Sequence, residues 1–223
     1  PISFEIRQTE KFREASGSAE YISSPDGVKP GIFYVPVPDP KKFNTAGMES
    51  LFLHEAIPGH HFQSSIQLEN KSLPEFRKHI WTYGPYVEGW ALYSETLGKE
   101  LGLYKDPYQY FTALGEQMLR AVRLVMDVGI HYKGMTREQA ITYMMENYPT
   151  TKEYAVSETE RYMAIPGQAL GYRIGVIRIK AMRERIRSKM GDRFKLADFH
   201  DAFLKMGSMP IGLVEEEMDR VFQ

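Results

Sequence analysis

The chain has 223 residues and a formal net charge of −1, with 28 lysines and arginines against 29 aspartates and glutamates. This length suffices for one domain with a full hydrophobic core, and the near-neutral balance gives no basic surface of the kind that binds nucleic acid. The lack of cysteine excludes disulfides, cysteine-ligated zinc and a thiol nucleophile, and no apolar run approaches the roughly 20 residues of a transmembrane segment.

Residues 1–40 are predicted to form strands and loops. Residues 2–7 alternate weakly, and a second short strand is expected at 19–23. The strongest strand pattern covers residues 31–37, where a proline confines the strand to an edge or an end of a sheet. An edge strand beside a catalytic helix would bind an extended peptide through its backbone, with Tyr34 among the substrate contacts. A plain structural hairpin fits the same pattern equally well.

From residue 45 the chain is predicted to be helical nearly to its end. Prolines near first turns, amphipathic runs and the capping-box sequence Thr136-Arg137-Glu138-Gln139 separate the helices. One helix starts near residue 45 and carries the histidines described next, and another starts near residue 72. The others are expected at about 85–103, 107–131, 136–148, 157–163, 168–190, 196–206 and 211–222. The fold class is therefore mainly α (α+β), with a small N-terminal β element and a single domain over residues 1–223.

Three of the six histidines fall within the segment His54-Glu55-Ala56-Ile57-Pro58-Gly59-His60-His61. Neutral imidazole is a good ligand for zinc, and a carboxylate beside a metal-bound water is the usual general base of metal-assisted hydrolysis. Apolar residues on both sides indicate a buried helix. His54 is therefore the first candidate ligand and Glu55 the candidate base.

The spacing departs from His-Glu-x-x-His, in which the two ligands are four residues apart on one helical face. Pro58 occupies that position, and on a straight helix neither His60 nor His61 can share an ion with His54. A bulge at Pro58 and the following glycine would absorb two residues and bring His60 to the required place. His60 is the predicted second ligand. His61 is then a neighbour that contacts substrate, or the ligand itself if the register differs by one residue. A kinked helix with surface histidines is the competing structural interpretation.

A hydrolytic zinc site needs a third protein ligand and an open position. Glu88 lies in an apolar segment whose small residues, Gly89 and Ala91, would allow close approach to the histidine helix. Glu95 lies seven residues further on the same face and would orient a ligand, although both glutamates also fit a solvated stripe. The predicted cofactor is one zinc ion, with His54 and His60 as the other two ligands.

Glu88-Gly89-Trp90-Ala91 is similar to the Glu-Gly-Phe-Ala segment that supplies the third ligand in gluzincin metallopeptidases. The chain as a whole resembles a bacterial family known as domain of unknown function 885, whose members are often called "putative lipoproteins". The matching segments are residues 31–35, 54–63, 88–91, 127–131, 161–169 and 199–201. The resemblance implies a zinc-peptidase-like fold, a peptide substrate and a location in the cell envelope or outside the cell. Because family members look longer, it also implies that this chain is a C-terminal part, with the N-terminal part of the parent protein as a partner.

Arg123, Asp127 and His131 recur every fourth residue of one predicted helix. Asp127 would then orient His131 towards the metal or the substrate. The spacing alone favours an ordinary set of exposed side chains on one helical face. The resemblance to the family instead favours a catalytic role for His131.

Tyrosine hydroxyls often stabilise the oxyanion that forms when water attacks an amide. Tyr162 is the first candidate for this role, and Tyr172 is the second and a substrate contact. Arg161 beside Tyr162 is a candidate for binding a substrate carboxylate. With 14 tyrosines in the chain, a packed core residue is a strong alternative for either tyrosine.

The combined prediction is a zinc-dependent hydrolase of peptide or related amide bonds, in which Glu55 activates the water. The alternative is a catalytically inactive protein that keeps the peptidase fold and binds a peptide along residues 31–37. A carboxylate-bridged di-iron protein ranks last, because such proteins use paired Glu-x-x-His motifs and the sequence has none.

Overall fold

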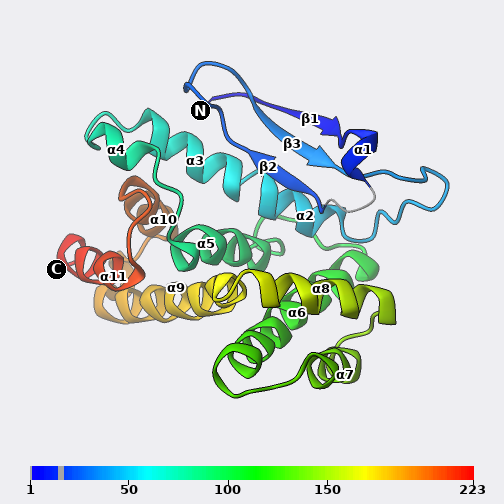
Figure 1. Ribbon diagram of the computed structural model, residues 1–223. Helices are drawn as coiled ribbons and strands as arrows, with labels where there is room; N and C mark the ends of the chain where they lie inside the picture. The colour runs from blue at the N-terminus through cyan, green and yellow to red at the C-terminus, as the bar shows by residue number, and fades with distance from the viewer. Residues whose placement is uncertain (1, 15–17) are drawn as a thin grey trace.

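The computed structural model describes residues 2–14 and 18–223, so residues 1 and 15–17 of the predicted strand-and-loop segment lie outside the described residues. The described part begins with a small sheet and continues as a stack of helices (Figure 1). The sheet contains β1 (Phe4–Gln8), β2 (Glu20–Ile22) and β3 (Gly31–Val35), and the short helix α1 (Lys11–Glu14) follows β1. The predicted mainly α fold with a small N-terminal β element is confirmed.

The remaining helices follow the predicted order. They are α2 (Met48–Glu55), α3 (His60–Glu69), α4 (Glu75–Lys78), α5 (Gly84–Thr96), α6 (Pro107–Tyr132), α7 (Arg137–Asn147), α8 (Lys152–Ala164), α9 (Gln168–Met190), the 3-10 turn η1 (Gly191–Arg193), α10 (Leu196–Lys205) and α11 (Ile211–Val221). The capping box is confirmed, because the Thr136 and Gln139 side chains each bond the other residue's backbone. Helix α8 begins five residues earlier than predicted, since Thr151 caps it by accepting from the Tyr154 amide.

The strand order is β1-β3-β2, with β1 parallel and β2 antiparallel to β3. Of the two placements predicted for the strand at residues 31–37, the edge of a sheet is wrong, because β3 lies between two other strands. The proline is confirmed at the end of the strand, since it directly follows the last residue of β3. Both sides of β3 are already hydrogen-bonded, so a peptide cannot pair with it. Tyr34 on β3 is 9% exposed, and the Arg13 guanidinium lies 4.6 Å from its ring centroid. This removes the surface on which the peptide-binding alternative depended.

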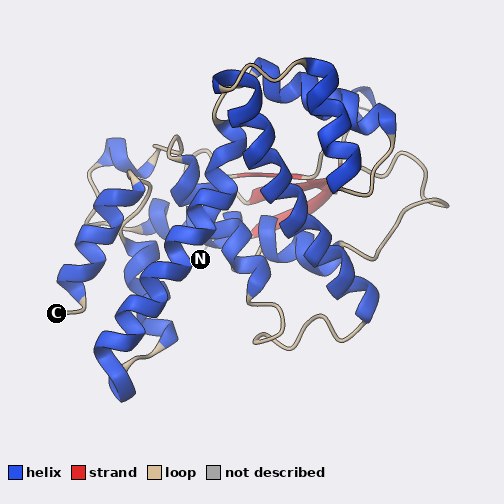
Figure 2. Cartoon of the chain, turned by 90° about the horizontal axis from the view of Figure 1, so that it is seen from below, coloured by secondary structure: helices blue, strands red, loops and turns tan. Residues whose placement is uncertain are grey.

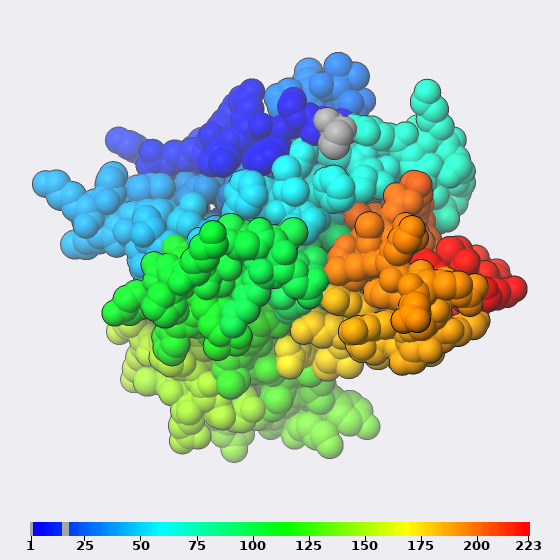
Figure 3. Space-filling model, turned by 180° about the vertical axis from the view of Figure 1, so that it is seen from behind, coloured from blue at the N-terminus to red at the C-terminus, as the bar shows by residue number. Residues whose placement is uncertain are grey.

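Helices from α2 onward lie on one side of the sheet (Figures 1 and 2). Phe33 and Val35 pack on Ala56, which joins the sheet to the end of α2. Beyond this layer, α5 and α9 form a core with α10 and α11, and a separate core joins α6, α7 and α8. Seen from behind, the sheet covers one end of the helical body and the last helices lie at its side (Figure 3). None of the helices in the described ranges has the length and hydropathy needed to cross a membrane.

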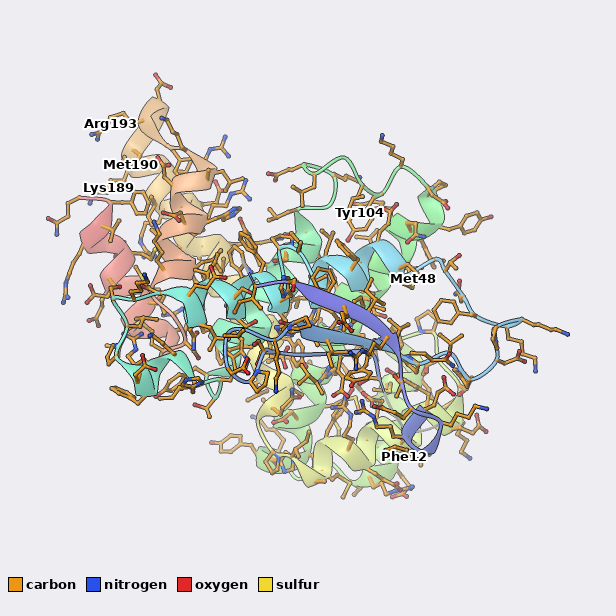
Figure 4. All side chains as sticks on the ribbon, turned by 90° about the horizontal axis from the view of Figure 1, so that it is seen from above. Phe12, Met48, Tyr104, Lys189, Met190 and Arg193 are labelled. Carbon is orange, nitrogen blue, oxygen red and sulfur yellow. The ribbon has the colours of Figure 1, made fainter. Side chains whose placement is uncertain are left out.

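The segment between α5 and α6 holds the start of α2 in place. The Tyr104 backbone N–H donates to the Glu49 carboxylate at 2.5 Å, and the Glu49 N–H donates to the Gln109 side chain at 3.2 Å. Met48 and Tyr104 accordingly lie together, far from Lys189 and Met190 at the end of α9 and from Arg193 in η1 (Figure 4). These contacts fix the direction in which α2 enters the centre of the molecule.

Helices α5 and α9 touch through their backbones. A Cβ atom built on Gly89 would lie 2.5 Å from the Gly175 Cα, and one on Gly175 would lie 2.2 Å from the Pro85 carbonyl oxygen. Gly171 approaches Gly84 in the same way. Gly89 therefore serves the contact with α9 and not, as predicted, the approach to the histidine helix. This contact places one face of α9 directly against the helix that carries Glu88.

Replacing Gly175 by alanine is expected to destabilise the fold by about 1–3 kcal/mol, because the added methyl group has no room between the two backbones. The measurement is the free energy of unfolding in urea. Gly115→Ala on α6 is the matched control, because a Cβ there meets no atom within 4 Å, and its expected effect is a stabilisation of about 0.5–1 kcal/mol. Equal effects of the two substitutions would contradict the backbone contact.

Candidate metal centre

The histidine segment forms two helices with a sharp break between them, not one bulged helix as predicted. Helix α2 ends at Glu55 and α3 begins at His60. At the break Gly59 lies so close to α2 that a Cβ would be 1.8 Å from the His54 carbonyl oxygen. The Pro58 carbonyl accepts a hydrogen bond of 2.7 Å from the Trp90 indole on α5. The break turns the start of α3 back towards the end of α2, and the His54 and His60 ring centroids lie 4.9 Å apart.

Three potential ligand atoms converge beside this break. The Glu88 Oε2 atom lies 3.3 Å from His60 Nε2 and 3.8 Å from His54 Nε2. All three groups offer ligand atoms within 4.8 Å of one another. Glu88 Oε2 is buried and has no hydrogen-bond partner, which is costly for a carboxylate oxygen unless a further group binds there. Of the two neighbouring histidines considered as second ligand, His60 is the one that belongs to this group.

A second carboxylate fixes the orientation of His54. Glu95 is 3% exposed, and its Oε1 atom lies 2.7 Å from His54 Nδ1. Because a carboxylate accepts, this contact places the imidazole proton on Nδ1 and leaves Nε2 free as a ligand. The Gln117 side chain donates to the other Glu95 oxygen at 3.2 Å. Glu95 therefore takes the orienting position that the sequence predicted, and it is not part of a solvated stripe.

The other oxygen of Glu88 is held by two side chains of α9. The Tyr172 hydroxyl donates to Glu88 Oε1 at 2.9 Å, and the Gln168 amide donates to the same atom at 3.3 Å. The Tyr172 ring also stacks on His54 with centroids 6.3 Å apart. These bonds leave Oε2 as the oxygen that faces the histidines.

The electrostatics of the centre favour an ionised carboxylate. Burial acts to raise the pKa of Glu88, but the imidazole of His60, with a smaller contribution from His54, outweighs it and holds the pKa at about 2. Burial acts to lower the pKa of His60, and Glu88, with smaller contributions from Glu55 and Glu95, raises it overall. Burial, followed by the charge of Glu88, raises the pKa of Tyr172 and so keeps its hydroxyl protonated as a donor.

Glu55 is the last residue of α2 and is 7% exposed. Its negative charge contributes to raising the pKa of His60, so the carboxylate lies within electrostatic range of the centre. Within residues 2–14 and 18–223 it makes no hydrogen bond or ion pair. A nearly buried carboxylate without a partner is available to accept a proton.

His61 faces away from the three ligands and towards the sheet. Its ring lies 4.5 Å from that of Phe4, and its Nδ1 atom lies 3.0 Å from the Tyr21 hydroxyl. It is 2% exposed, and burial lowers its pKa. These contacts join α3 to the sheet. They do not support the predicted role of His61 as a substrate contact.

Tyr162 and Arg161 both engage Glu158 on their own helix. The Tyr162 hydroxyl donates to Glu158 at 2.6 Å, and the residue is 1% exposed. The Arg161 guanidinium holds the same carboxylate with two bonds, of 2.5 and 2.8 Å. The structure therefore brings Tyr172, and not Tyr162, into contact with Glu88.

His131 and Asp127 bond to different partners. The His131 Nε2 atom lies 2.9 Å from the Tyr162 carbonyl oxygen, and the side chain is exposed near the end of α6. The Asp127 carboxylate accepts from the Gly167 N–H at 2.9 and 3.2 Å, at the first residue before α9. Asp127 thus caps α9 and does not orient His131.

Sequence reasoning missed Gln117 and Gln168, the two amides that support the glutamates of the centre. Neutral amides at ordinary helix positions carry no local signal of such a role. The available signal for Gln168 was its position four residues before Tyr172, on the same face of a helix.

The chain is similar to two solved structures over nearly its whole length. The putative lipoprotein from Colwellia psychrerythraea is 41% identical with a TM-score of 0.94, and the match covers 99% of this chain and 38% of that one. A putative lipoprotein of unknown function from Shewanella oneidensis is 28% identical with a TM-score of 0.80, covering 98% and 40%. The chain thus spans about two fifths of the length of these relatives. No curated protein matches the chain. A family model described as "Bacterial protein of unknown function (DUF885)" matches residues 1–218, and the chain therefore belongs to that family.

Proposed function

We propose that this chain contains the active site of a zinc-dependent hydrolase that cleaves peptide or related amide bonds. The observation that carries the proposal is the convergence of His54, His60 and Glu88, together with a buried Glu88 oxygen that faces the two imidazoles and makes no hydrogen bond. The similarity of residues 88–91 to the third-ligand segment of gluzincin peptidases supports the same conclusion.

The donor set fits a zinc ion. Two imidazole nitrogens and one carboxylate oxygen are a known ligand set of hydrolytic zinc sites, and ligands at about 2.0–2.1 Å in a tetrahedral arrangement lie roughly 3.4 Å apart. The separations of 3.3 and 3.8 Å between Glu88 and the two histidines are close to this value. Bound zinc supplies a Lewis acid that makes a water molecule easy to deprotonate near neutral pH.

The protein groups around the centre then have separate tasks. The Glu55 carboxylate accepts a proton from the attacking water, whose oxygen bonds to the amide carbon as the C–N bond breaks. The same proton passes to the leaving nitrogen, so that atoms and charges balance. Glu95 fixes the His54 ring. The Tyr172 hydroxyl, which stays protonated and bonds to Glu88 in the structure, is the proposed donor to the negative charge that develops on the amide oxygen.

The names of the two solved relatives bear on location. Both are called putative lipoproteins, and we infer from this that the parent protein is associated with the cell envelope. Because the chain covers about two fifths of each relative, we propose that the complete protein is longer and that its N-terminal part is a partner of this chain. Fractionation of cells that express the complete protein tests the location.

Elemental analysis of the purified chain tests the metal proposal. We expect about one zinc ion per chain, and loss of most of it when His54, His60 or Glu88 is replaced by alanine, because three protein ligands are the minimum for a hydrolytic site. His61→Ala is the matched control and should retain the metal, since that ring bonds to Tyr21. Retention of zinc by all three ligand variants, or its loss in His61→Ala alone, would contradict the assignment.

A further inference from the structure

A second charged group lies close to the centre and takes no part in the proposed chemistry. Arg123 on α6 is 5% exposed, yet it forms no ion pair within residues 2–14 and 18–223. Its only hydrogen bond there runs from Nη2 to the Gln168 amide oxygen at 2.9 Å. Arginine is almost never buried to this extent without an anionic partner.

The acidic groups nearest to Arg123 are already occupied. Glu158, whose pKa Arg123 helps to lower, binds Arg161 and Tyr162. Asp127, one turn further along α6, accepts from the Gly167 backbone. The guanidinium therefore has no hydrogen-bonded anionic partner among the described residues. Its Nε atom is buried without a partner, and its Nη1 atom makes no hydrogen bond among the described residues.

Two side chains connect this charge to the metal ligands. The Arg123 guanidinium lies over the Tyr172 ring, 4.3 Å from its centroid, and the Tyr172 hydroxyl bonds to Glu88. Gln168 accepts from Arg123 and donates to the same Glu88 oxygen. The Gln168 amide lies between the two groups, bonded to Arg123 Nη2 at 2.9 Å and to Glu88 Oε1 at 3.3 Å. Arg123 Nη2 is therefore within roughly 9 Å of Glu88. A peptide advances about 3.3–3.6 Å per residue, so one or two residues span this gap.

We propose that Arg123 binds the free α-carboxylate of the substrate, and that the substrates are peptides whose C-terminus lies one or two residues beyond the cleaved bond. The planar guanidinium matches a carboxylate geometrically. The aromatic face of Tyr172 holds it in place while leaving Nη1 free. This inference deepens the proposed function and gives the role considered for Arg161 to Arg123, because Arg161 is already bound in a bidentate manner by Glu158.

The test compares binding of free acids and amides. The probes are N-acetylated tetrapeptides of mixed sequence, each prepared with a free C-terminus and as the C-terminal amide. They are titrated calorimetrically into zinc-supplemented Glu55→Gln chain, which prevents turnover. A hydrogen-bonded charge pair contributes enough for the acids to bind about 10- to 100-fold more tightly than the amides.

Variants show which arginine causes the preference for free acids over amides. Arg123→Gln should reduce the acid-to-amide ratio to about one, and Arg123→Lys should keep part of it. Arg185→Gln, which changes a surface arginine that pairs with Asp219 on α11, should keep all of it. Zinc content and thermal unfolding of each variant separate loss of recognition from loss of folding.

Equal binding of acids and amides by the chain with native Arg123 would overturn the inference, and so would binding of neither set. The inference would also be overturned if the acid-to-amide binding ratio fell to one in Arg161→Gln and stayed unchanged in Arg123→Gln. Failure of the proposed zinc-dependent hydrolysis would give different results from failure of the role of Arg123. A chain that lacks zinc or hydrolysis can still prefer acids, and an active enzyme that cleaves acids and amides equally refutes only the role of Arg123.

Discussion

Replacing Glu55 by glutamine should lower kcat by a factor of about 10²–10⁴, the usual contribution of a positioned general base. Glutamine keeps the size and polarity of the side chain but cannot accept the proton of the attacking water. Glu55 is nearly buried, lies beside His60 and has no hydrogen-bond partner among the described residues. The substitution therefore breaks no contact, and the chain should keep its metal and its stability.

The measurement is hydrolysis of a peptide found by library screening, together with zinc content. Glu216→Gln removes the same charge from an exposed position on α11 and should leave kcat at the level of the unmodified chain. Loss of zinc in Glu55→Gln would make Glu55 a ligand and not the base. Full activity with full metal content would remove Glu55 from the mechanism altogether.

Tyr172→Phe should lower kcat by about 10²–10³ with little change in KM or metal content. The hydroxyl bonds to Glu88, one of the three proposed ligands, and in the proposed mechanism it donates to the developing oxyanion. An interaction made only in the transition state affects kcat and kcat/KM equally, which distinguishes it from simple substrate binding.

Comparing kcat of Tyr172→Phe with that of Tyr162→Phe decides which of the two candidate tyrosines stabilises the oxyanion. The Tyr162 hydroxyl is bound to Glu158, so its removal should affect stability more than turnover. Tyr108→Phe, at a residue that is 73% exposed, controls for the loss of a hydroxyl as such. A large decrease in kcat for Tyr162→Phe with none for Tyr172→Phe would return the role to Tyr162.

Local patterns were enough to predict most elements and to single out the three residues that converge in the candidate metal centre. The capping box at Thr136 and the strand pattern after residue 30 depend on neighbours in sequence, and both elements were found where predicted. His54, His60 and Glu88 were identified because ligand residues in apolar surroundings are unusual. The path of the chain between the two histidines was not predicted, because it depends on a contact of Gly59 with α2 and a hydrogen bond from Trp90.

Strand order and the choice of tyrosine also depend on distant partners. The central place of β3 follows from two other strands that pair with it on opposite sides, and nothing within residues 31–37 encodes their arrangement. Tyr162 and Tyr172 both lie in helical, partly apolar sequence. Only the contact between α5 and α9 determines which hydroxyl meets Glu88.

The glycine contact between α5 and α9 also limits how many geometries the centre can adopt. Glu88 precedes Gly89, and Tyr172 follows Gly171, so both functional side chains start from backbone that touches the facing helix. Where side chains separate two helices, each change of rotamer shifts the helices relative to each other. Glycine has no rotamers, so at these contacts the distance between the two backbones does not depend on the torsions of an intervening side chain. Random mutagenesis should therefore find these glycines as intolerant of substitution as the ligands, although they carry no chemical group.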